Sequence, residues 1–150
     1  MNHIRAASLE DLTRIAEIEI FNYRLNFYPI FLCDEFYFGE LQVPNKVKEY
    51  LDNENFLHET FVYDDGVVKG FIRIAGCEAK QLFVEPVLQG QKIGEKLLTF
   101  AMEEKGVNNL WALEKNERAI AFYKHHGFQV TDEKKLEEDT TEYLVRLKKL

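Results

Sequence analysis

The chain has 150 residues, which is enough for one domain with a sizeable hydrophobic core but too few for two. Hydrophobic side chains make up 46% of it and charged side chains 30%, which excludes disordered and fibrous proteins. With 19 basic and 26 acidic side chains the net charge is −7, so a nucleic-acid-binding protein, which needs a basic surface, is not expected.

Hydrophobic periodicity and turn residues divide the chain into strands and helices. In chain order, the predicted elements are a strand at 4–6, a helix from 9 to about 21, a loop with a short helix at 22–39, a helix at 44–51, strands at 59–63, 67–75 and 78–84, a helix at 93–105, a strand at 110–113, a helix at 117–125, and strands at 128–131 and 143–147. This order predicts a single domain over residues 1–150 of the α/β (α+β) class, in which helices cover the faces of a mixed sheet.

Capping and turn residues mark the ends of these elements. Ser8, with Asp11 three residues later, predicts a capping box at the first helix. The Asp-Asp-Gly turn at 64–66 predicts a hairpin. Gly106 predicts the end of the helix at 93–105. The acidic connection at 132–139, between the last two strands, is expected to be a solvated loop.

The segment from Leu82 to Gly94 reads Leu-Phe-Val-Glu-Pro-Val-Leu-Gln-Gly-Gln-Lys-Ile-Gly, so a strand ends, a glycine-containing turn follows and a helix begins. Such a junction leaves backbone N–H groups unpaired at the positive end of the helix dipole, which is a suitable site for an anion. The alternative is a plain strand-to-helix turn. Neither a G-K-[ST] sequence nor a G-x-G-x-x-G sequence is present.

A second segment, from Asn116 to Phe128, reads Asn-Glu-Arg-Ala-Ile-Ala-Phe-Tyr-Lys-His-His-Gly-Phe. Together the two segments resemble the GNAT (N-acetyltransferase) superfamily, with its Q/R-x-x-G-x-G/A acyl-CoA motif and its N-x-x-A-x-x-F-Y-x-x-x-G-F pattern. The order of elements also matches, so the resemblance covers essentially the whole chain. It implies a mixed, mostly antiparallel central sheet that is splayed at the CoA site and flanked by about four helices.

One position departs from the acyl-CoA motif. The family usually has glycine at the fourth position, where this chain has Lys92, whereas Gln89 and Gly94 fit the first and sixth positions. Lysine is conformationally acceptable at the start of a helix, so we expect CoA binding to persist. The Lys92 ammonium could itself meet a phosphate.

The resemblance also implies which residues contact CoA. Strand amides near Phe83 and Val84 would pair with the pantetheine arm, and the Val84 N–H or a near neighbour's would stabilise the oxyanion. Asn116 matches a residue that hydrogen-bonds pantetheine, although a helix N-cap is the alternative. The expected cofactor-binding residues are Leu82, Phe83, Val84, Gln89, Gly90, Gln91, Lys92, Ile93, Gly94, Asn116 and Tyr123.

Two catalytic roles are expected. Tyr123 matches the family's proton donor to the CoA thiolate, and the alternative is a core aromatic residue. Glu78 is the first candidate for the base that deprotonates the amine, through water. Glu85 and Glu114 are alternatives, and each of the three could instead be a solvated carboxylate at a strand end. His125 and His126 are read as structural, at a helix C-terminus.

An aromatic segment between the first helices is expected to form the acceptor pocket. Its members are Phe21, Tyr23, Phe27, Tyr28, Phe31, Phe36, Tyr37 and Phe38. Asp34 and Glu35 lie among them, so the pocket would be acid-rimmed and would suit a small amine with an apolar portion. A satellite hydrophobic cluster or a dimer interface is the alternative.

The function that the resemblance implies is an acetyl-CoA-dependent N-acetyltransferase, an enzyme that moves the acetyl group directly to a primary amine of a small molecule or peptide. The alternatives are acetylation of a protein N-terminus or lysine, and a non-catalytic CoA-binding domain. No metal is expected, because Cys33 and Cys77 form no ligand spacing with the histidines. No signal peptide or membrane span is visible, so we expect a cytoplasmic protein with no membrane partner, and a homodimer is possible.

Overall fold

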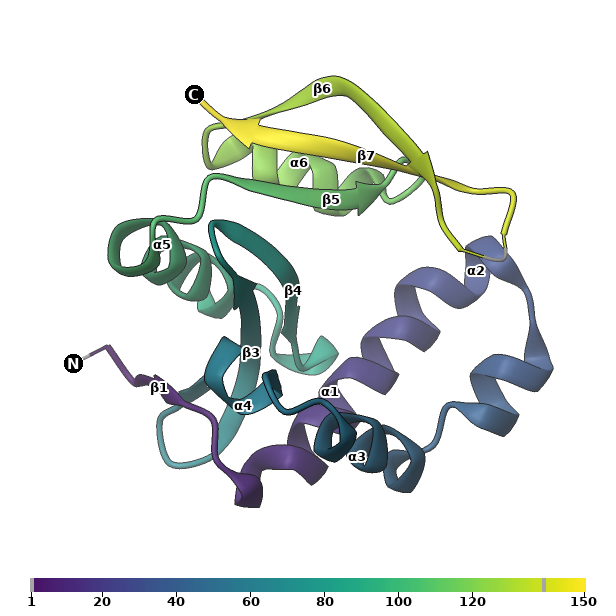
Figure 1. Ribbon diagram of the computed structural model, residues 1–150, viewed down its shortest axis with the longest axis vertical. Helices are drawn as coiled ribbons and strands as arrows, with labels where there is room; N and C mark the ends of the chain where they lie inside the picture. The colour runs from purple at the N-terminus through teal and green to yellow at the C-terminus, as the bar shows by residue number, and fades with distance from the viewer. Residues whose placement is uncertain (1, 139) are drawn as a thin grey trace.

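The computed structural model describes residues 2–138 and 140–150, and within them a seven-stranded sheet has the strand order β1-β2-β3-β4-β5-β7-β6 (Figure 1). The strands are β1 (Ile4–Ala6), β2 (Thr60–Asp64), β3 (Val68–Ala75), β4 (Glu78–Val84), β5 (Asn109–Leu113), β6 (Phe128–Leu136) and β7 (Tyr143–Lys149). The helices are α1 (Leu12–Asn22), α2 (Tyr28–Phe31), α3 (Val43–Asp52), α4 (Phe56–Glu59), α5 (Ile93–Lys105) and α6 (Glu117–His125).

The sheet is split between β4 and β5. These two strands are parallel and pair only at Glu78 with Asn109 and at Ala79 with Leu110, although β4 continues to Val84. The other neighbouring strands pair antiparallel. The expected mixed, mostly antiparallel sheet that is splayed in its middle is therefore confirmed.

Helices pack on both faces of the sheet because its central strands are apolar on both faces. On β3, the neighbouring residues Phe71 and Ile72 point to opposite faces, and both are 0% exposed. Phe71 belongs to a core with the α1 side chains, and Ile72 to a core with the α5 side chains. Burial of each such side chain contributes about 1.5–3 kcal/mol.

Gly70 on β3 allows α5 to approach the sheet closely. A Cβ atom at this position would lie 3.0 Å from the Phe83 carbonyl oxygen and 3.2 Å from Leu97 Cδ1. The first of these distances involves backbone that cannot move aside. Glycine therefore suits the contact that seats α5 beside β4, because any larger residue would push its neighbours apart.

Several predicted elements are confirmed with their bounds, among them the strands at 4–6 and 78–84 and the helix at 117–125. The capping box is also present, with the Asp11 carboxylate accepting from the Ser8 N–H at 2.8 Å. The single turn α4 was not predicted.

Two predictions of loops are wrong. Residues 22–39 are mostly helical, with π-helical turns at Tyr23–Phe27 and Glu35–Glu40 on either side of α2, because their aromatic side chains pack around Ile20 and Tyr37. We call residues 23–40 the aromatic arm. The connection after residue 131 is not a solvated loop either, because β6 continues to Leu136 after an irregularity in its pairing with β7. Asp139 lies outside the described residues.

None of the helices in residues 2–138 and 140–150 combines the length and the apolar character that crossing a membrane requires.

Candidate active site

An open cleft of about 1390 Å³ lies where the sheet splits. Residues 79–84 of β4 and 111–113 of β5 form its base, and the starts of α5 and α6 line one side. The aromatic arm and the β6–β7 connection line the other side, where the connection reaches toward α2 (Figure 1). The cleft therefore has two distinct approaches, one from the α5 and α6 side and one from the aromatic arm.

Two backbone amides of β4 face this split. The Glu85 N–H donates to the Lys69 carbonyl oxygen at 2.9 Å, and Phe83 lies opposite Phe71. Since antiparallel pairing alternates along a strand, the Phe83 peptide is bonded to β3, and the N–H groups of Leu82 and Val84 point away from it. Because β5 pairs only as far as Ala79, these two groups have no partner in the sheet.

The turn before α5 is strained at Lys92. Gly90 has φ +90°, which suits glycine, but Lys92 also has a left-handed backbone, with φ +66°. Lys92 is the N-cap of α5 and does not yet have helical backbone angles. A Cβ is unfavourable in the left-handed conformation, at a cost of about 1–2 kcal/mol. The expectation that lysine is conformationally acceptable here is therefore wrong. The Lys92 side chain lines the cleft, and Gln91 does not.

The motif glutamine points inward. Gln89 Nε2 lies 3.3 Å from Asn22 Oδ1 and 3.5 Å from the Val84 carbonyl oxygen. Two later motif residues lie at the start of α5. Ile93 is a core residue, and Gly94 packs at the cleft, where a Cβ would lie 3.6 Å from the Phe122 ring. Gln89 therefore holds the turn against β4 through its side chain.

Asn22 is a site residue that the sequence reasoning missed. It is 2% exposed, lines the cleft, and donates Nδ2–H to the carbonyl oxygens of Ile18 and Val84, each at 2.8 Å. A signal was present, because Asn22 falls on the same helical face as Ile15 and Ile18 and is polar where a core residue is expected.

Tyr123 lies between the cleft and the core. It lines the cleft, and its ring contacts Phe122 and Phe128, with centroids 5.3 Å and 6.0 Å apart. Burial raises the pKa of Tyr123 to about 12. The shift keeps the hydroxyl protonated at neutral pH, so Tyr123 presents an O–H donor at the cleft wall.

Asn116 caps α6 and also lines the cleft. Its Oδ1 accepts from the Ala119 N–H at 3.2 Å, so the N-cap reading is correct, and its Nδ2 group remains available to a ligand. The exposed side chain of Arg118, in the first turn of α6, lines the cleft as well. Together with Lys92 it makes this side of the cleft positive.

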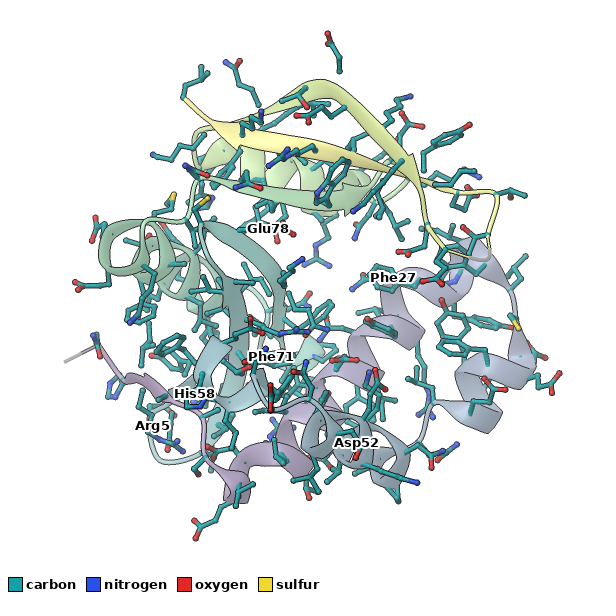
Figure 2. The ribbon with its side chains drawn as sticks, in the orientation of Figure 1. Arg5, Phe27, Asp52, His58, Phe71 and Glu78 are labelled. Carbon is teal, nitrogen blue, oxygen red and sulfur yellow. The ribbon has the colours of Figure 1, made fainter. Side chains whose placement is uncertain are left out.

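The three candidate bases lie outside the cleft lining. Glu78 forms an ion pair with Lys80 at 3.4 Å. It lies at the start of β4 next to β5, away from the aromatic arm, which Phe27 marks in Figure 2. Glu85 pairs with Arg14 at 3.3 Å, and Glu114 with Lys134 at 2.6 Å. The carboxylates that do line the cleft are those of Glu40, Glu95, Glu137, Glu138 and Glu142.

The aromatic arm forms a small hydrophobic cluster and also lines one side of the cleft. Its side chains pack on a small core of Ile20, Tyr37 and Leu41. The aromatic members that also line the cleft are Tyr23, Phe27, Phe31, Phe36 and Tyr37. The expected acidic rim of Asp34 and Glu35 is wrong, because neither lines the cleft and Asp34 accepts from the Tyr28 hydroxyl. Acidic groups reach this side from Glu40 and from the β6–β7 connection.

The two histidines differ in position. His126 lines the cleft, with Nδ1 2.8 Å from the Phe122 carbonyl oxygen and Nε2 3.7 Å from Glu95 Oε1, whereas His125 is exposed. Across the described part of the chain, no group of three or more His, Cys, Asp or Glu side chains is placed to hold a metal ion.

Residues 57–130 match the family model of the acetyltransferase (GNAT) domain. A segment of 70 residues is 34% identical to the peptidyl-lysine N-acetyltransferase YjaB of Salmonella typhimurium and covers 47% of this chain and 48% of that protein. The chain spans about half the length of the curated relatives it matches.

Solved structures share the whole fold. The apo form of YjaB from Escherichia coli matches with a TM-score of 0.78 at 23% identity, covering 98% of this chain and 96% of that one. The PaiA N-acetyltransferase of Thermoplasma acidophilum, solved in complex with coenzyme A, matches with a TM-score of 0.68 at 24% identity, covering 98% of both chains.

Proposed function

We propose that this chain, whose residues 57–130 match the acetyltransferase (GNAT) domain, transfers the acetyl group of acetyl-CoA directly to a primary amine of a small molecule or peptide. The observation that carries the proposal is the pair of unpaired β4 amides, at Leu82 and Val84, in a split that Tyr123 also lines. These groups are the donors that the reaction needs at the thioester.

The residues at the split fit acetyl-CoA. The amides of Leu82 and Val84 can pair with the pantetheine arm as an added strand would. Lys92, Arg118 and the first amides of α5 supply positive charge for the phosphates. The remaining expected contacts, including Gln89, Gly90 and Asn116, line the same cleft.

In the proposed reaction the amine nitrogen attacks the thioester carbonyl carbon, and the C–S bond then breaks. The Val84 N–H stabilises the oxyanion that forms. The Tyr123 hydroxyl gives its proton to the departing thiolate sulfur, and the proton that the nitrogen loses passes through water and restores the Tyr123 hydroxyl, so the products are an acetamide and CoA thiol. That Glu78 is the base stays a prediction. Because Glu78 lies outside the cleft lining, it would have to act through water.

Acidic side chains on the acceptor side favour a positively charged acceptor. Glu137 and Glu138 line the cleft beside the aromatic arm, opposite the positive turn before α5, together with Glu142, which pairs with Lys115 at 2.6 Å. A lysine side chain of a peptide would fit such an open cleft, and YjaB, which the chain resembles, is named a peptidyl-lysine N-acetyltransferase. Acetylation of protein lysines is therefore the second candidate function.

The test is a thermal melt followed by turnover. Acetyl-CoA at about 100 times its dissociation constant should stabilise the fold by about 2.7 kcal/mol. Release of CoA thiol is then measured with a capped lysine peptide, 1,4-diaminobutane and phenethylamine. A shift without any turnover would support a non-catalytic CoA-binding domain, and no shift would refute CoA binding.

The remaining expectations stay predictions. Acetyl-CoA as cosubstrate and the exposed, unbridged thiols of Cys33 and Cys77 support a location in the cytoplasm. A homodimer, the absence of nucleic-acid and membrane partners, metal-free chemistry and the single-domain organisation over residues 1–150 are predictions of the same kind.

A further inference from the structure

A buried carboxylate, that of Glu19 on α1, lies directly behind the acceptor side of the cleft. Glu19 is 0% exposed. Its Oε1 accepts from the Tyr50 hydroxyl at 2.9 Å and from Gln81 Nε2 at 3.0 Å, and its Oε2 lies 2.5 Å from Lys46 Nζ. The carboxylate therefore joins α1, α3 and β4, although nothing in the proposed reaction uses it.

The groups around Glu19 are held in their donor forms. Desolvation lowers the pKa of Lys46, but the charges of Glu19 and Glu49 together outweigh it, and the pKa lies above its ordinary value. Burial, followed by the Glu19 charge, raises the pKa of Tyr50 well above its ordinary value. Lys46 thus stays an ammonium and Tyr50 a phenol, and both donate to a carboxylate that can only accept.

This carboxylate fixes the orientation of the Gln81 carboxamide. Because Glu19 Oε1 accepts, Gln81 must present its NH2 group there, and its carbonyl oxygen Oε1 must point the other way. Gln81 Oε1 is closed off from bulk water and has no hydrogen-bond partner among residues 2–138 and 140–150. A buried acceptor without a donor is unfavourable, so a donor supplied by a ligand would satisfy it.

Gln81 stands where the two approaches to the cleft meet. It lines the cleft and immediately precedes Leu82, whose N–H faces the split. Its side chain lies on the α1 face of the sheet, beside the Tyr23 hydroxyl, whereas Val84 packs toward Gly94 on the α5 face. Gln81 is therefore next to Tyr23 of the aromatic arm and one residue from the proposed thioester site at Leu82.

We propose that Gln81 Oε1 accepts a hydrogen bond from the acceptor amine and that Glu19 is the positioning residue that fixes Gln81 for this contact. The inference rests on the proposed acetyl transfer. A neutral primary amine has two N–H donors and one lone pair. When one N–H is directed at Gln81, the lone pair is free to point at the thioester carbon beside the Leu82 and Val84 amides.

The experiment compares Gln81→Met with wild type in CoA thiol release, using the capped lysine peptide, 1,4-diaminobutane and phenethylamine as probes. Methionine keeps the volume and removes the whole carboxamide, which includes both the carbonyl oxygen and the NH2 group that donates to Glu19. The KM for the amine should rise about tenfold or more, as for a lost hydrogen bond to a charged or polarised donor, while the KM for acetyl-CoA stays unchanged. Gln129→Met, the same change on the exposed face of β6, is the matched control and should change neither value.

Two further variants keep the test decisive. Gln81→Asn retains both polar groups on a shorter side chain and should raise the amine KM in the same way if Gln81→Met folds poorly. Glu19→Gln combined with Lys46→Met removes the acceptor-only carboxylate without leaving an unpaired ammonium, and it should raise the amine KM and spare the KM for acetyl-CoA.

The outcomes separate this inference from the proposed function. Wild type that turns over, with an unchanged amine KM in folded Gln81→Met and Gln81→Asn, overturns the role of Gln81 alone. An unchanged amine KM in the Glu19 and Lys46 double variant overturns the role of Glu19. Wild type that shows no melting shift with acetyl-CoA and no turnover with any probe overturns the proposed function, and the inference with it.

Discussion

The side-chain amide of Asn22 on α1 donates to the carbonyl oxygen of Val84 at the end of β4, at 2.8 Å, across 62 residues of sequence. The same amide group donates to Ile18 within the helix, and its oxygen lies 3.3 Å from Gln89 Nε2. One buried side chain thus ties the helix on the acceptor side to the peptide beside the proposed oxyanion site and to the turn on the CoA side.

Replacing Asn22 with alanine should destabilise the fold and weaken acetyl-CoA binding. The change leaves the buried Val84 carbonyl without its donor, which costs about 1–3 kcal/mol, and frees Gln89. The measurement is chemical denaturation together with an acetyl-CoA titration. Asn26→Ala is the control, because Asn26 contributes only a 3.4 Å contact to Asn22 and should cost less than about 0.5 kcal/mol. Equal losses in the two variants would contradict the role of Asn22.

Removing the Tyr123 hydroxyl should slow turnover without harming the fold. Tyr123→Phe keeps the ring contacts with Phe122 and Phe128 and should lower kcat about 100-fold or more, as for loss of a positioned proton donor. CoA thiol release measures kcat, and a melt with acetyl-CoA checks binding. Tyr143→Phe, at an exposed site on β7, is the matched control. An unchanged kcat in Tyr123→Phe would leave Tyr123 as a core residue only.

Position 92 should separate backbone strain from charge. Lys92→Gly removes the side chain from a left-handed backbone with φ +66° and should stabilise the fold by about 1 kcal/mol. Lys92→Ala keeps the Cβ and loses the rest of the side chain, including the ammonium, so it should not stabilise the fold. Both variants should bind acetyl-CoA more weakly and with less dependence on salt than wild type. Salt-independent binding in wild type would argue against contact between Lys92 and a phosphate.

The Arg5–Asp11 pair should make stability depend on pH below neutrality. The hydrogen bond from Arg5, and further bonds from Ser8, hold the pKa of Asp11 below its ordinary value, despite desolvation. An aspartate with a lowered folded-state pKa stabilises the fold above the ordinary pKa of about 3.9, and this contribution disappears as the pH falls through the folded value.

The Asp11 contribution should be about 1 kcal/mol, because Arg5 is 43% exposed and the pair is screened by solvent. Melting curves from pH 7 to pH 2 should show a shallower acid-side loss in Asp11→Asn than in wild type. Asp52→Asn, at an exposed position on α3, should follow the wild-type curve. Identical slopes in wild type and Asp11→Asn would refute the prediction.

Most of the fold was predictable because local signals agreed with tertiary packing. The strand at 78–84 ends at a proline-containing turn, and the helix at 117–125 has an asparagine cap and a glycine after its end. The aromatic arm was not predictable in this way. Its helical turns are held by packing around Tyr37 and by Arg24, which donates to the Tyr37 carbonyl oxygen 13 residues away, and periodicity does not report such contacts.

The cofactor side of the site was easier to predict than the acceptor side. Motif residues such as Gln89 and Gly94 lie in one continuous segment, so their spacing identifies them. Asn22, Glu19 and Gln81 come from two distant elements, and only their pairing across the sheet gives them a role. The left-handed backbone of Lys92 was also hidden, because the sequence there is compatible with an ordinary helix start.

The split between β4 and β5 leaves unpaired backbone groups along β4 in the interior of the sheet. Proteins usually avoid free strand edges because such edges pair with other chains. Here the edge lies in the cleft, with α5 and α6 on one side and the aromatic arm on the other, and these elements restrict edge-to-edge pairing with a strand of another chain. A narrow, unbranched molecule with amide groups of its own could still pair with this edge. The recess that restricts pairing with another chain at this edge would therefore also favour a narrow molecule as the partner of the β4 amides.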